Sequence, residues 1–190
     1  MRIQHYVVTG ALLFSVCAMS ARADEVVTPT AVTPQQQTLI QRYTAKAQAA
    51  TQAATQATQA ALSQALDLLG IRYRMGGTTP ENGFDCSGFV GHVFKEGLGM
   101  VLPRTAKEIS QTGEVVAQDE LKPGDLVFFN TMRRTFSHVG IYLGNNQFVH
   151  APSAGGVVRV EDMSIAYWAA RYDGARRLLP NAQSRQTQAN

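Results

Sequence analysis

The sequence predicts an α+β domain in which helices come first and an antiparallel sheet follows. Two observations support this class. Apolar residues recur at helical spacing within residues 61–69 and 86–96, whereas beyond residue 122 short apolar runs are separated by Gly, Pro and Asn turns, as in strands. Because helices and strands are segregated along the chain instead of alternating, the pattern favours an α+β fold over a doubly wound one.

Length and composition fit one folded domain with short extensions. The chain has 190 residues, of which 45% are hydrophobic and 16% charged. This suffices to bury a core and excludes disordered, collagen-like and coiled-coil classes. The formal charge is +3, but Arg2 and Arg22 lie in a predicted leader, so 15 basic residues would face 14 acidic ones in the mature chain. Without a Lys/Arg stripe, we do not expect a nucleic-acid partner. Because no apolar run after the leader is long enough to cross a bilayer, we do not expect stable membrane insertion.

Residues 1–23 have the pattern of a secretory signal peptide. Arg2 is followed by an apolar stretch over 6–19 that is too short to span a bilayer, and a small-x-small cleavage site ends the segment. We therefore expect a secreted protein whose mature chain starts at Asp24, with cleavage after Ser20 as the alternative.

Two cysteines are present, and only one of them lies beyond the leader. Lipidation at Cys17 is disfavoured because Val16 stands where lipoprotein signals have a small residue. Removal of the leader would leave Cys86 alone, which excludes a disulfide scaffold.

The stretch between the leader and the domain has a different composition. Residues 24–37 contain two prolines and few apolar residues, which predicts a flexible linker. Residues 38–60 are rich in Ala, Gln and Thr, which favours a solvated helix or tether. The predicted segments are a signal peptide at 1–23, a linker and helical arm at 24–60, one folded domain at 61–180 and a disordered tail at 181–190.

The folded domain opens with helices. Residues 61–69 are predicted to face the core, because apolar side chains recur there at helical spacing: Ala61, Leu62, Ala65, Leu68 and Leu69. Residues 86–96 form the next predicted helix, with Asp85 as its N-cap and Cys86 in its first turn. Thr105–Glu108 has capping-box spacing, which predicts a further short helix.

The second half of the domain is predicted to consist of strands joined by tight turns. A Lys-Pro-Gly-Asp turn at 122–125 precedes the first apolar run, and Gly144–Asn146 has the composition of a hairpin turn. The strands are predicted to form a meander of Leu126–Phe129, Ser137–Leu143, Gln147–Ala151, Val157–Val160 and Arg171–Leu178.

Cys86 is the candidate nucleophile. A thiol in the first turn of a helix faces unpaired N–H groups and the positive end of the helix dipole, which favours the thiolate. Such a thiol also needs a proton partner, usually a histidine, and His92, His138 and His150 follow it in the chain. His92 lies six residues after Cys86, so on a helix it points away from the thiol and is interpreted as a surface or packing residue.

His138 and His150 lie on consecutive strands of the predicted hairpin. If the loop is Gly144–Asn146, His150 lies opposite Gly140 and on the same face as His138, with Cα atoms roughly 7–8 Å apart. The two imidazoles are then within reach of each other. If the loop is only Asn145–Asn146, His150 turns to the opposite face and the constellation fails, so this prediction depends on the strand register.

Other interpretations of these residues remain open. A lone buried cysteine is more often a small apolar residue than a nucleophile. Cys86, His138 and His150 together would suit a zinc ion, but the chain lacks the closely spaced Cys or His pairs common in zinc sites. We therefore predict neither a metal nor an organic cofactor.

Six short motifs follow one another between residues 62 and 179. They are Tyr73-Arg-Met-Gly-Gly, Gly83-Phe-Asp-Cys-Ser-Gly-Phe, Leu102-Pro-Arg-Thr, Lys122-Pro-Gly-Asp-Leu, His138-Val-Gly-Ile-Tyr and Phe148-Val-His-Ala. Together they resemble the NlpC-type family of papain-like cysteine peptidases, which cleave peptide stems and crosslinks of peptidoglycan, and the chain looks similar to murein endopeptidases of Gram-negative bacteria. The resemblance implies a papain-like α+β fold, a peptidoglycan substrate, a periplasmic location and hydrolysis through a cysteine thioester. We expect a monomer.

The resemblance also implies roles for the matched residues. Cys86 would be the nucleophile, His138 its base and His150 the polar residue that orients this base. Tyr73 would line the site near the oxyanion, beside the backbone N–H of Cys86.

Three further residues match motif positions of the family on the substrate side. Ser87 would lend its backbone N–H or its hydroxyl to the substrate. For Asp85, helix capping is an equal alternative, and Arg104 either holds its loop through a salt bridge or faces the cleft. A non-catalytic peptidoglycan-binding or regulatory module, and a secreted toxin acting on a competitor's wall, are the alternative functions.

Overall fold

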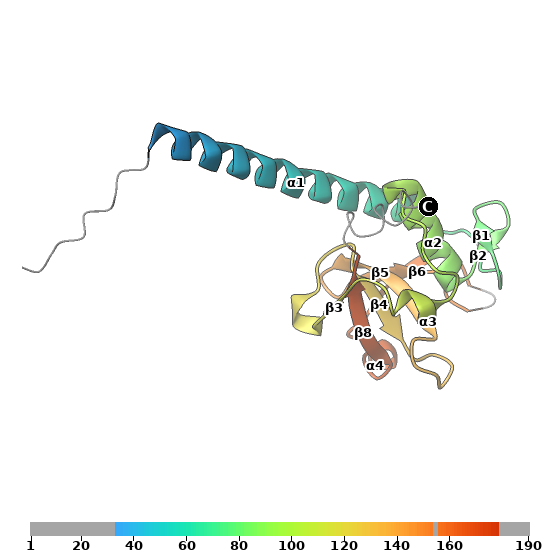
Figure 1. Ribbon diagram of the computed structural model, residues 1–190. Coiled ribbons are helices and arrows are strands. Elements are labelled where there is room, and N and C mark those ends of the chain that lie inside the picture. The colour runs from blue at the N-terminus through green and yellow to red at the C-terminus, as the bar shows by residue number, and fades with distance from the viewer. Residues whose placement is uncertain (1–32, 154–155, 179–190) are drawn as a thin grey trace, which may run out of the picture. The chain divides into compact units, whose positions relative to one another are not determined.

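The computed structural model of the chain describes residues 33–153 and 156–178 (Figure 1). The predicted signal peptide, residues 24–32 of the linker, the lipidation alternative at Cys17 and the polar tail lie outside these residues. Among the helices described, none combines the length and the apolar character needed to cross a membrane. The chain divides into two units between Ile40 and Gln41, and the second unit holds all the candidate site residues.

Helix α1 (Pro34–Asp67) starts earlier than the composition suggested, inside the stretch predicted to be a linker. Its start carries reciprocal caps, because the Gln36 N–H donates to Thr33 Oγ1 at 3.3 Å and the Thr33 N–H donates to Gln36 Oε1 at 2.9 Å. Pro34 occupies the first helical position, where its fixed φ suits the helix and its missing N–H has no helical partner to lose.

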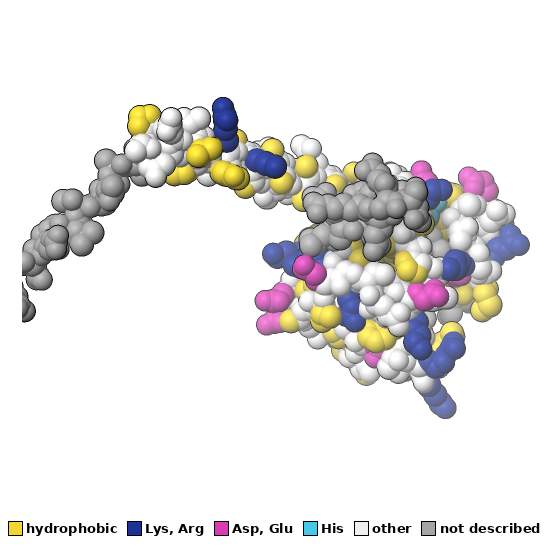
Figure 2. All heavy atoms as spheres, in the orientation of Figure 1, with side chains coloured by type: hydrophobic (Ala, Val, Ile, Leu, Met, Phe, Trp, Pro, Cys, Tyr) yellow, Lys and Arg dark blue, Asp and Glu magenta, His cyan; other side chains and the backbone are white. Residues whose placement is uncertain are grey.

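The first half of α1 is solvated, and its end is not. Its threonine hydroxyls donate to carbonyls about one turn earlier, and exposed apolar side chains stand out near its start (Figure 2), among them Leu39, Ile40 and Tyr43. Burial begins at Ala61 and Ala65 and continues at Leu68, which confirms a core-facing segment. Leu69 was predicted to join them but is 45% exposed, because the helix has already ended at Asp67.

Helix α2 (Cys86–Leu98) packs against strand β5 of the sheet. The predicted apolar side is buried, with Phe89, Val90, Val93 and Phe94 all inside the core. Gly99 ends the helix in the left-handed conformation, with φ of 64°. Helix α3 (Ala106–Ile109) begins with the predicted capping box between Thr105 and Glu108. The remaining short elements are β1 (Thr78–Thr79), β2 (Gly83–Phe84), a 3₁₀ turn at Gln118–Glu120 and α4 (Ala166–Ala169).

The sheet has six antiparallel strands in the order β3-β8-β4-β5-β6-β7. Their bounds are β3 (Glu114–Val116), β4 (Leu126–Phe129), β5 (His138–Gly144), β6 (Gln147–His150), β7 (Arg159–Asp162) and β8 (Tyr172–Arg177). The α+β class is confirmed. The predicted meander holds only from β4 to β7, because β8 returns to pair with β4 on one side and β3 on the other.

Two strands differ from the prediction for local reasons. Strand β3 was missed because it is short and buries only Val116. The strand expected at Val157–Val160 runs over Arg159–Asp162 instead, and Val157 only forms an isolated bridge with Arg72.

Both faces of the sheet are covered, which explains why β4 is apolar throughout. Leu126 and Phe128 belong to the core cluster on the α2 side, and Val127 and Phe129 belong to a second cluster on the opposite side. Trp168, from α4, is the largest side chain of the second cluster. The histidines of β5 and β6 reach this second side, so their surroundings depend on α4 and β7.

Candidate active site

Cys86 lies at the position that the capping pattern predicted. Asp85 is the N-cap of α2, with φ −89° and ψ 175°, and its Oδ1 accepts a hydrogen bond of 2.7 Å from the Gly88 N–H. Its Oδ2 accepts another, of 2.9 Å, from the Gly76 N–H. These bonds tie the loop before β1 to the start of α2 and fix the backbone that carries the Cys86 thiol.

Arg104 completes a polar cluster with Asp85 and Ser87. Its guanidinium donates to both carboxylate oxygens of Asp85, at 3.1 and 2.5 Å, and to Ser87 Oγ at 2.9 Å. Burial alone would raise the pKa of Asp85, but the hydrogen bonds from Arg104 and Gly88 hold it below its usual value. The structure thus shows Asp85 capping α2 and Arg104 in a salt bridge with it, and neither contact tests a role toward the substrate.

The electrostatics of the thiol differ from the prediction. Burial raises the pKa of Cys86 above its usual value, and the Asp85 carboxylate adds to this effect. Backbone N–H groups of Val139, Ser87 and Cys86 itself act in the opposite direction without reversing it. The backbone N–H groups at the helix start therefore act in the predicted direction, but desolvation outweighs them and the net effect favours the protonated thiol.

The β5–β6 hairpin places the two histidines on one face, but it does so through a β-bulge that the sequence did not predict. Its loop is only Asn145–Asn146, both with positive φ, and Gly144 pairs with Gln147. The register shifts between Tyr142 and Gly144, so that Ile141 pairs with Val149. The expectation that a two-residue loop would separate the histidines is therefore wrong, because this bulge inserts one residue and restores the register.

The two imidazoles are in direct contact. His138 Nε2 and His150 Nδ1 are 2.7 Å apart, and the rings meet edge to face with centroids 5.0 Å apart. Burial and the neighbouring His150 lower the pKa of His138 to about 3, although Glu161 acts in the opposite direction. Burial and the Arg159 cation also lower the pKa of His150 to about 3. Both rings are therefore neutral at physiological pH.

Glu161 on β7 is a polar neighbour of this pair that the sequence analysis missed. Its Oε2 lies 3.5 Å from His150 Nε2 and accepts the N–H of Trp168, while Arg159 donates to Oε1 at 2.5 Å. Trp168 also stacks on His138, with centroids 5.6 Å apart and an interplanar angle of 24°. The signal was present, because Arg159 and Glu161 share one face of a strand, but the predicted strand ended at Val160.

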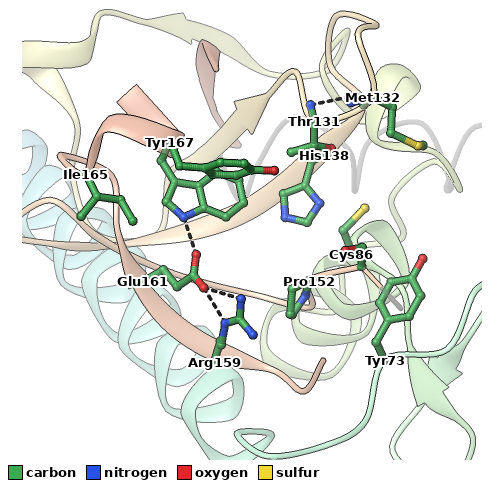
Figure 3. Close-up of a pocket in the computed structure, with 13 residues that line it drawn as sticks. Tyr73, Cys86, Thr131, Met132, His138, Pro152, Arg159, Glu161, Ile165 and Tyr167 are labelled. Carbon is green, nitrogen blue, oxygen red and sulfur yellow. Dashed lines mark hydrogen bonds and ion pairs between the residues drawn. The ribbon is translucent and has the colours of Figure 1, made fainter. Parts of the chain in front are cut away.

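Cys86 and His138 line the same pocket, which has a volume of about 380 Å³ (Figure 3). Tyr73 lies beside Cys86 in this pocket, and Glu161 and Tyr167 lie on the side of His138. Burial and the nearby Cys86 raise the pKa of Tyr73, so its phenol remains a hydrogen-bond donor. The fully buried His150 supports His138 from behind.

The other predicted residues lie outside this pocket. Ser87 and Arg104 line a separate hollow of about 480 Å³ together with His92, whose ring packs on Phe84 at 5.2 Å. The structure thus brings together Tyr73, Cys86, His138 and His150, whereas Asp85, Ser87 and Arg104 form the polar cluster beside the start of α2.

The geometry of the histidine pair does not suit a shared metal ion. Nitrogens 2.7 Å apart are at hydrogen-bond distance, and two ligands at about 2.0–2.1 Å from one zinc ion would be held further apart in a tetrahedral site. In the described part of the chain, residues 33–153 and 156–178, no three Cys, His, Asp or Glu side chains gather as metal ligands.

Most of the folded domain is similar to known proteins. The model of the NlpC/P60 family matches residues 70–177. The Escherichia coli K12 protein named murein DD-endopeptidase MepS/murein LD-carboxypeptidase is 48% identical over 118 residues, covering 62% of this chain and 61% of the relative. Murein DD-endopeptidase MepH of the same strain is 39% identical over 145 residues, covering 75% of this chain and 51% of the relative.

A solved structure supports the fold independently of these relatives. The crystal structure of an NlpC/P60 family protein from Bacillus cereus matches with a TM-score of 0.61 at 32% identity, covering 65% of this chain and 40% of that chain. The chain spans 61% and 51% of the lengths of the two E. coli relatives, so what the likeness establishes is confined to the shared region.

Proposed function

The chain belongs to the NlpC/P60 family, and from this premise we propose that it is a cysteine peptidase that hydrolyses amide bonds in peptidoglycan stem peptides or crosslinks. The observation that carries the proposal is the placement of Cys86 and His138 in one pocket, with His138 hydrogen-bonded to a buried His150. The names of the two E. coli relatives, both murein endopeptidases, support peptidoglycan as the substrate.

In the proposed mechanism, a neutral thiol and a neutral imidazole are the resting state. The raised pKa of Cys86 and the lowered pKa of His138 both favour this state over a thiolate–imidazolium pair. Proton transfer from Cys86 to His138 therefore accompanies the attack of sulfur on the amide carbonyl. Because Nε2 of His138 is engaged by His150, Nδ1 is the ring nitrogen that accepts this proton.

The negative charge that develops on the carbonyl oxygen has donors nearby. The N–H of Cys86 lies in the first turn of α2, where it has no helical acceptor, and the Tyr73 phenol lies beside it. Donors of this kind stabilise a tetrahedral oxyanion. Protonated His138 then gives its proton to the leaving amine, and water activated by neutral His138 hydrolyses the thioester, which regenerates the Cys86 thiol.

Asp85, Ser87 and Arg104 are proposed to act on the position of Cys86 rather than on the substrate. Their side chains bond to one another and to the backbone at the start of α2, and they do not line the pocket of Cys86 and His138. Periplasmic location remains a proposal that rests on the signal-peptide pattern and on the murein endopeptidases among the relatives. A monomer is proposed as well.

The test is digestion of purified peptidoglycan sacculi by residues 24–190, beside Cys86→Ala and the control variant His92→Ala, with products identified by mass. We expect products from the wild type and from His92→Ala, but none from Cys86→Ala. Loss of crosslinked dimers would identify an endopeptidase that opens crosslinks, and shortened stems would identify cleavage within a stem. Equal product release by Cys86→Ala, or sacculus binding without any cleavage, would contradict the proposal and favour a binding module.

A further inference from the structure

Two neutral imidazoles that share one hydrogen bond can place their protons in two ways. In the first arrangement, His138 Nε2–H donates to His150 Nδ1, His150 carries its other proton on Nε2, and Nδ1 of His138 is a free base. In the second, His150 Nδ1–H donates to His138 Nε2, and the proton of His138 sits on Nδ1. Only the first arrangement leaves His138 able to accept the Cys86 proton.

We propose that Glu161 is a positioning residue that selects the first arrangement and so keeps His138 competent as a base. The proposal deepens the proposed function and rests on it for its catalytic consequence. It starts from the position of the Glu161 carboxylate, whose Oε2 lies 3.5 Å from Nε2 of His150. That nitrogen is buried and has no hydrogen-bond partner among the described residues.

An ionised carboxylate can only accept hydrogen bonds. A proton on His150 Nε2 therefore faces an attractive negative charge, as the first arrangement requires. In the second arrangement, the lone pair of Nε2 would face the same charge across 3.5 Å. Because His150 is fully buried and the Glu161 side chain is only 20% exposed, this repulsion is screened less than it would be in bulk water. Glu161 thus disfavours the arrangement in which His138 is unable to act.

The carboxylate is held in place by two donors from different elements. Trp168 of α4 donates its indole N–H to Oε2, and Arg159 of β7 donates to Oε1 at 2.5 Å. The same indole ring packs on both imidazoles, with centroids 5.6 Å from His138 and 5.1 Å from His150. The Trp168 side chain therefore holds both imidazole rings and also the Glu161 carboxylate, whose charge determines which ring nitrogens carry the protons.

The charged and titratable groups around the pair are few and come from identified elements. His138 of β5 faces Cys86 of α2, His150 of β6 and Glu161 of β7, and His150 also faces Arg159 of β7. Glu161 raises the pKa of His138 against the effect of burial. The carboxylate therefore also favours the protonated His138 that forms during the reaction.

The informative variant is Glu161→Gln. Glutamine removes the negative charge that faces Nε2 of His150, and it leaves one amide oxygen for the two donors Arg159 and Trp168. The second arrangement, with a proton on Nδ1 of His138, is then no longer disfavoured. The matched control is Asp162→Asn, the neighbouring carboxylate on β7, which bonds to Ser164 and not to the histidines.

The first readout is the protonation of each imidazole nitrogen, measured by ¹⁵N NMR on the full chain at neutral pH. We expect an unprotonated Nδ1 on His138 in the wild type and in Asp162→Asn, and a measurable fraction of protonated Nδ1 in Glu161→Gln. The second readout is hydrolysis, where we expect kcat of Glu161→Gln to fall about 100-fold, the lower end of what a general base contributes, with a much smaller change in KM.

The two readouts separate failure of this inference from failure of the proposed function. A protonated Nδ1 on His138 in the wild type would overturn the inference without any variant, even if Glu161→Gln did not fold. Unchanged nitrogen signals and an unchanged kcat in a folded Glu161→Gln would also overturn it. Wild type that shows the expected tautomer but cleaves no peptidoglycan would overturn the proposed function alone.

Discussion

The two halves of the candidate active site are built in opposite ways. The half around Cys86 is polar and charged, with an ionised Asp85 held by Arg104 and by backbone N–H groups at the start of α2. The half around His138 and His150 is buried, with two neutral imidazoles assembled from three paired strands and α4 and the Arg159–Glu161 ion pair at its edge. A neutral imidazole can take the thiol proton as sulfur attacks, so no thiolate–imidazolium pair has to form beforehand.

Acid should affect the histidine half before the Cys86 half. The pKa values of His138 and His150 are about 3 in the folded chain against 6.5 in the reference state, so unfolded histidines bind protons that folded ones do not. The free energy of unfolding should therefore fall as the pH drops from about 6.5 towards 3, by at most about 1.4 kcal/mol per pH unit for each histidine. Urea melts of the full chain between pH 7.5 and 4.5 measure this slope.

In the same experiment, a variant separates the contribution of the histidine pair to the pH dependence of stability from that of the rest of the chain. His150→Gln removes one titrating group and should remove about half of the slope, and His92→Gln, which replaces the histidine beside Phe84 and outside the pair, is the control. Parallel curves for wild type and His150→Gln would show that the buried pair does not govern the acid response.

The histidine half should also be the more sensitive to small steric changes. A Cβ at Gly140 would lie 2.7 Å from the Phe148 ring, 2.9 Å from the Val149 carbonyl oxygen and 3.2 Å from the Cβ of His150. Gly140→Ala is therefore expected to cost about 1–3 kcal/mol of stability and to reduce hydrolysis by shifting His150. Thermal melts and sacculus digestion measure the two effects.

Gly91 is the matched control for this substitution. It lies in α2, and a Cβ there meets nothing within 4 Å, so Gly91→Ala should stabilise the helix by about 0.5–1 kcal/mol with full activity. Equal stability of the two alanine variants would mean that the space at Gly140 is not needed to seat His150.

The sequence predicted best what is decided within a few residues. The Asp85 cap, the capping box at Thr105–Glu108 and the strand Leu126–Phe129 all occur where the pattern placed them. Each cap is a hydrogen bond between residues three positions apart, and the strand is a run of four apolar residues. Local chemistry therefore determines the local structure in all three cases.

The sequence failed where the outcome depends on distant segments. The return of β8 between β3 and β4 follows from packing on both faces of the sheet, and the bulge before Gly144 changes the register that the loop length implied. Glu161 reaches His150 only because β6 and β7 pair. The thiol pKa likewise depends on burial by the whole domain, which a helix start does not reveal.

The smallest effect is expected in the Cys86 half, from Asp85→Asn. Asparagine is as good an N-cap as aspartate, so the variant keeps the cap to Gly88 and removes the charge opposite Arg104. It also gives up the acceptor of the Gly76 N–H, which is exposed and can bond to water instead. Because that guanidinium is 46% exposed, the loss should be about 1 kcal/mol at neutral pH. The pKa of Asp85 is lowered in the folded chain, so its contribution is present above the unfolded pKa near 3.8 and disappears as the pH falls through the folded value.

Activity then distinguishes the two roles that the sequence left open for this cluster. If Asp85 and Arg104 only hold the start of α2, Asp85→Asn and Arg104→Gln should each lower kcat no more than a few-fold, and their stability effects should be non-additive, as for a contacting pair. A variant with wild-type stability and a strongly raised KM would instead assign the cluster to substrate binding. Because Ser87 and Arg104 also line the hollow beside α2, that result would extend the substrate path past the Cys86–His138 pocket and around the start of the helix.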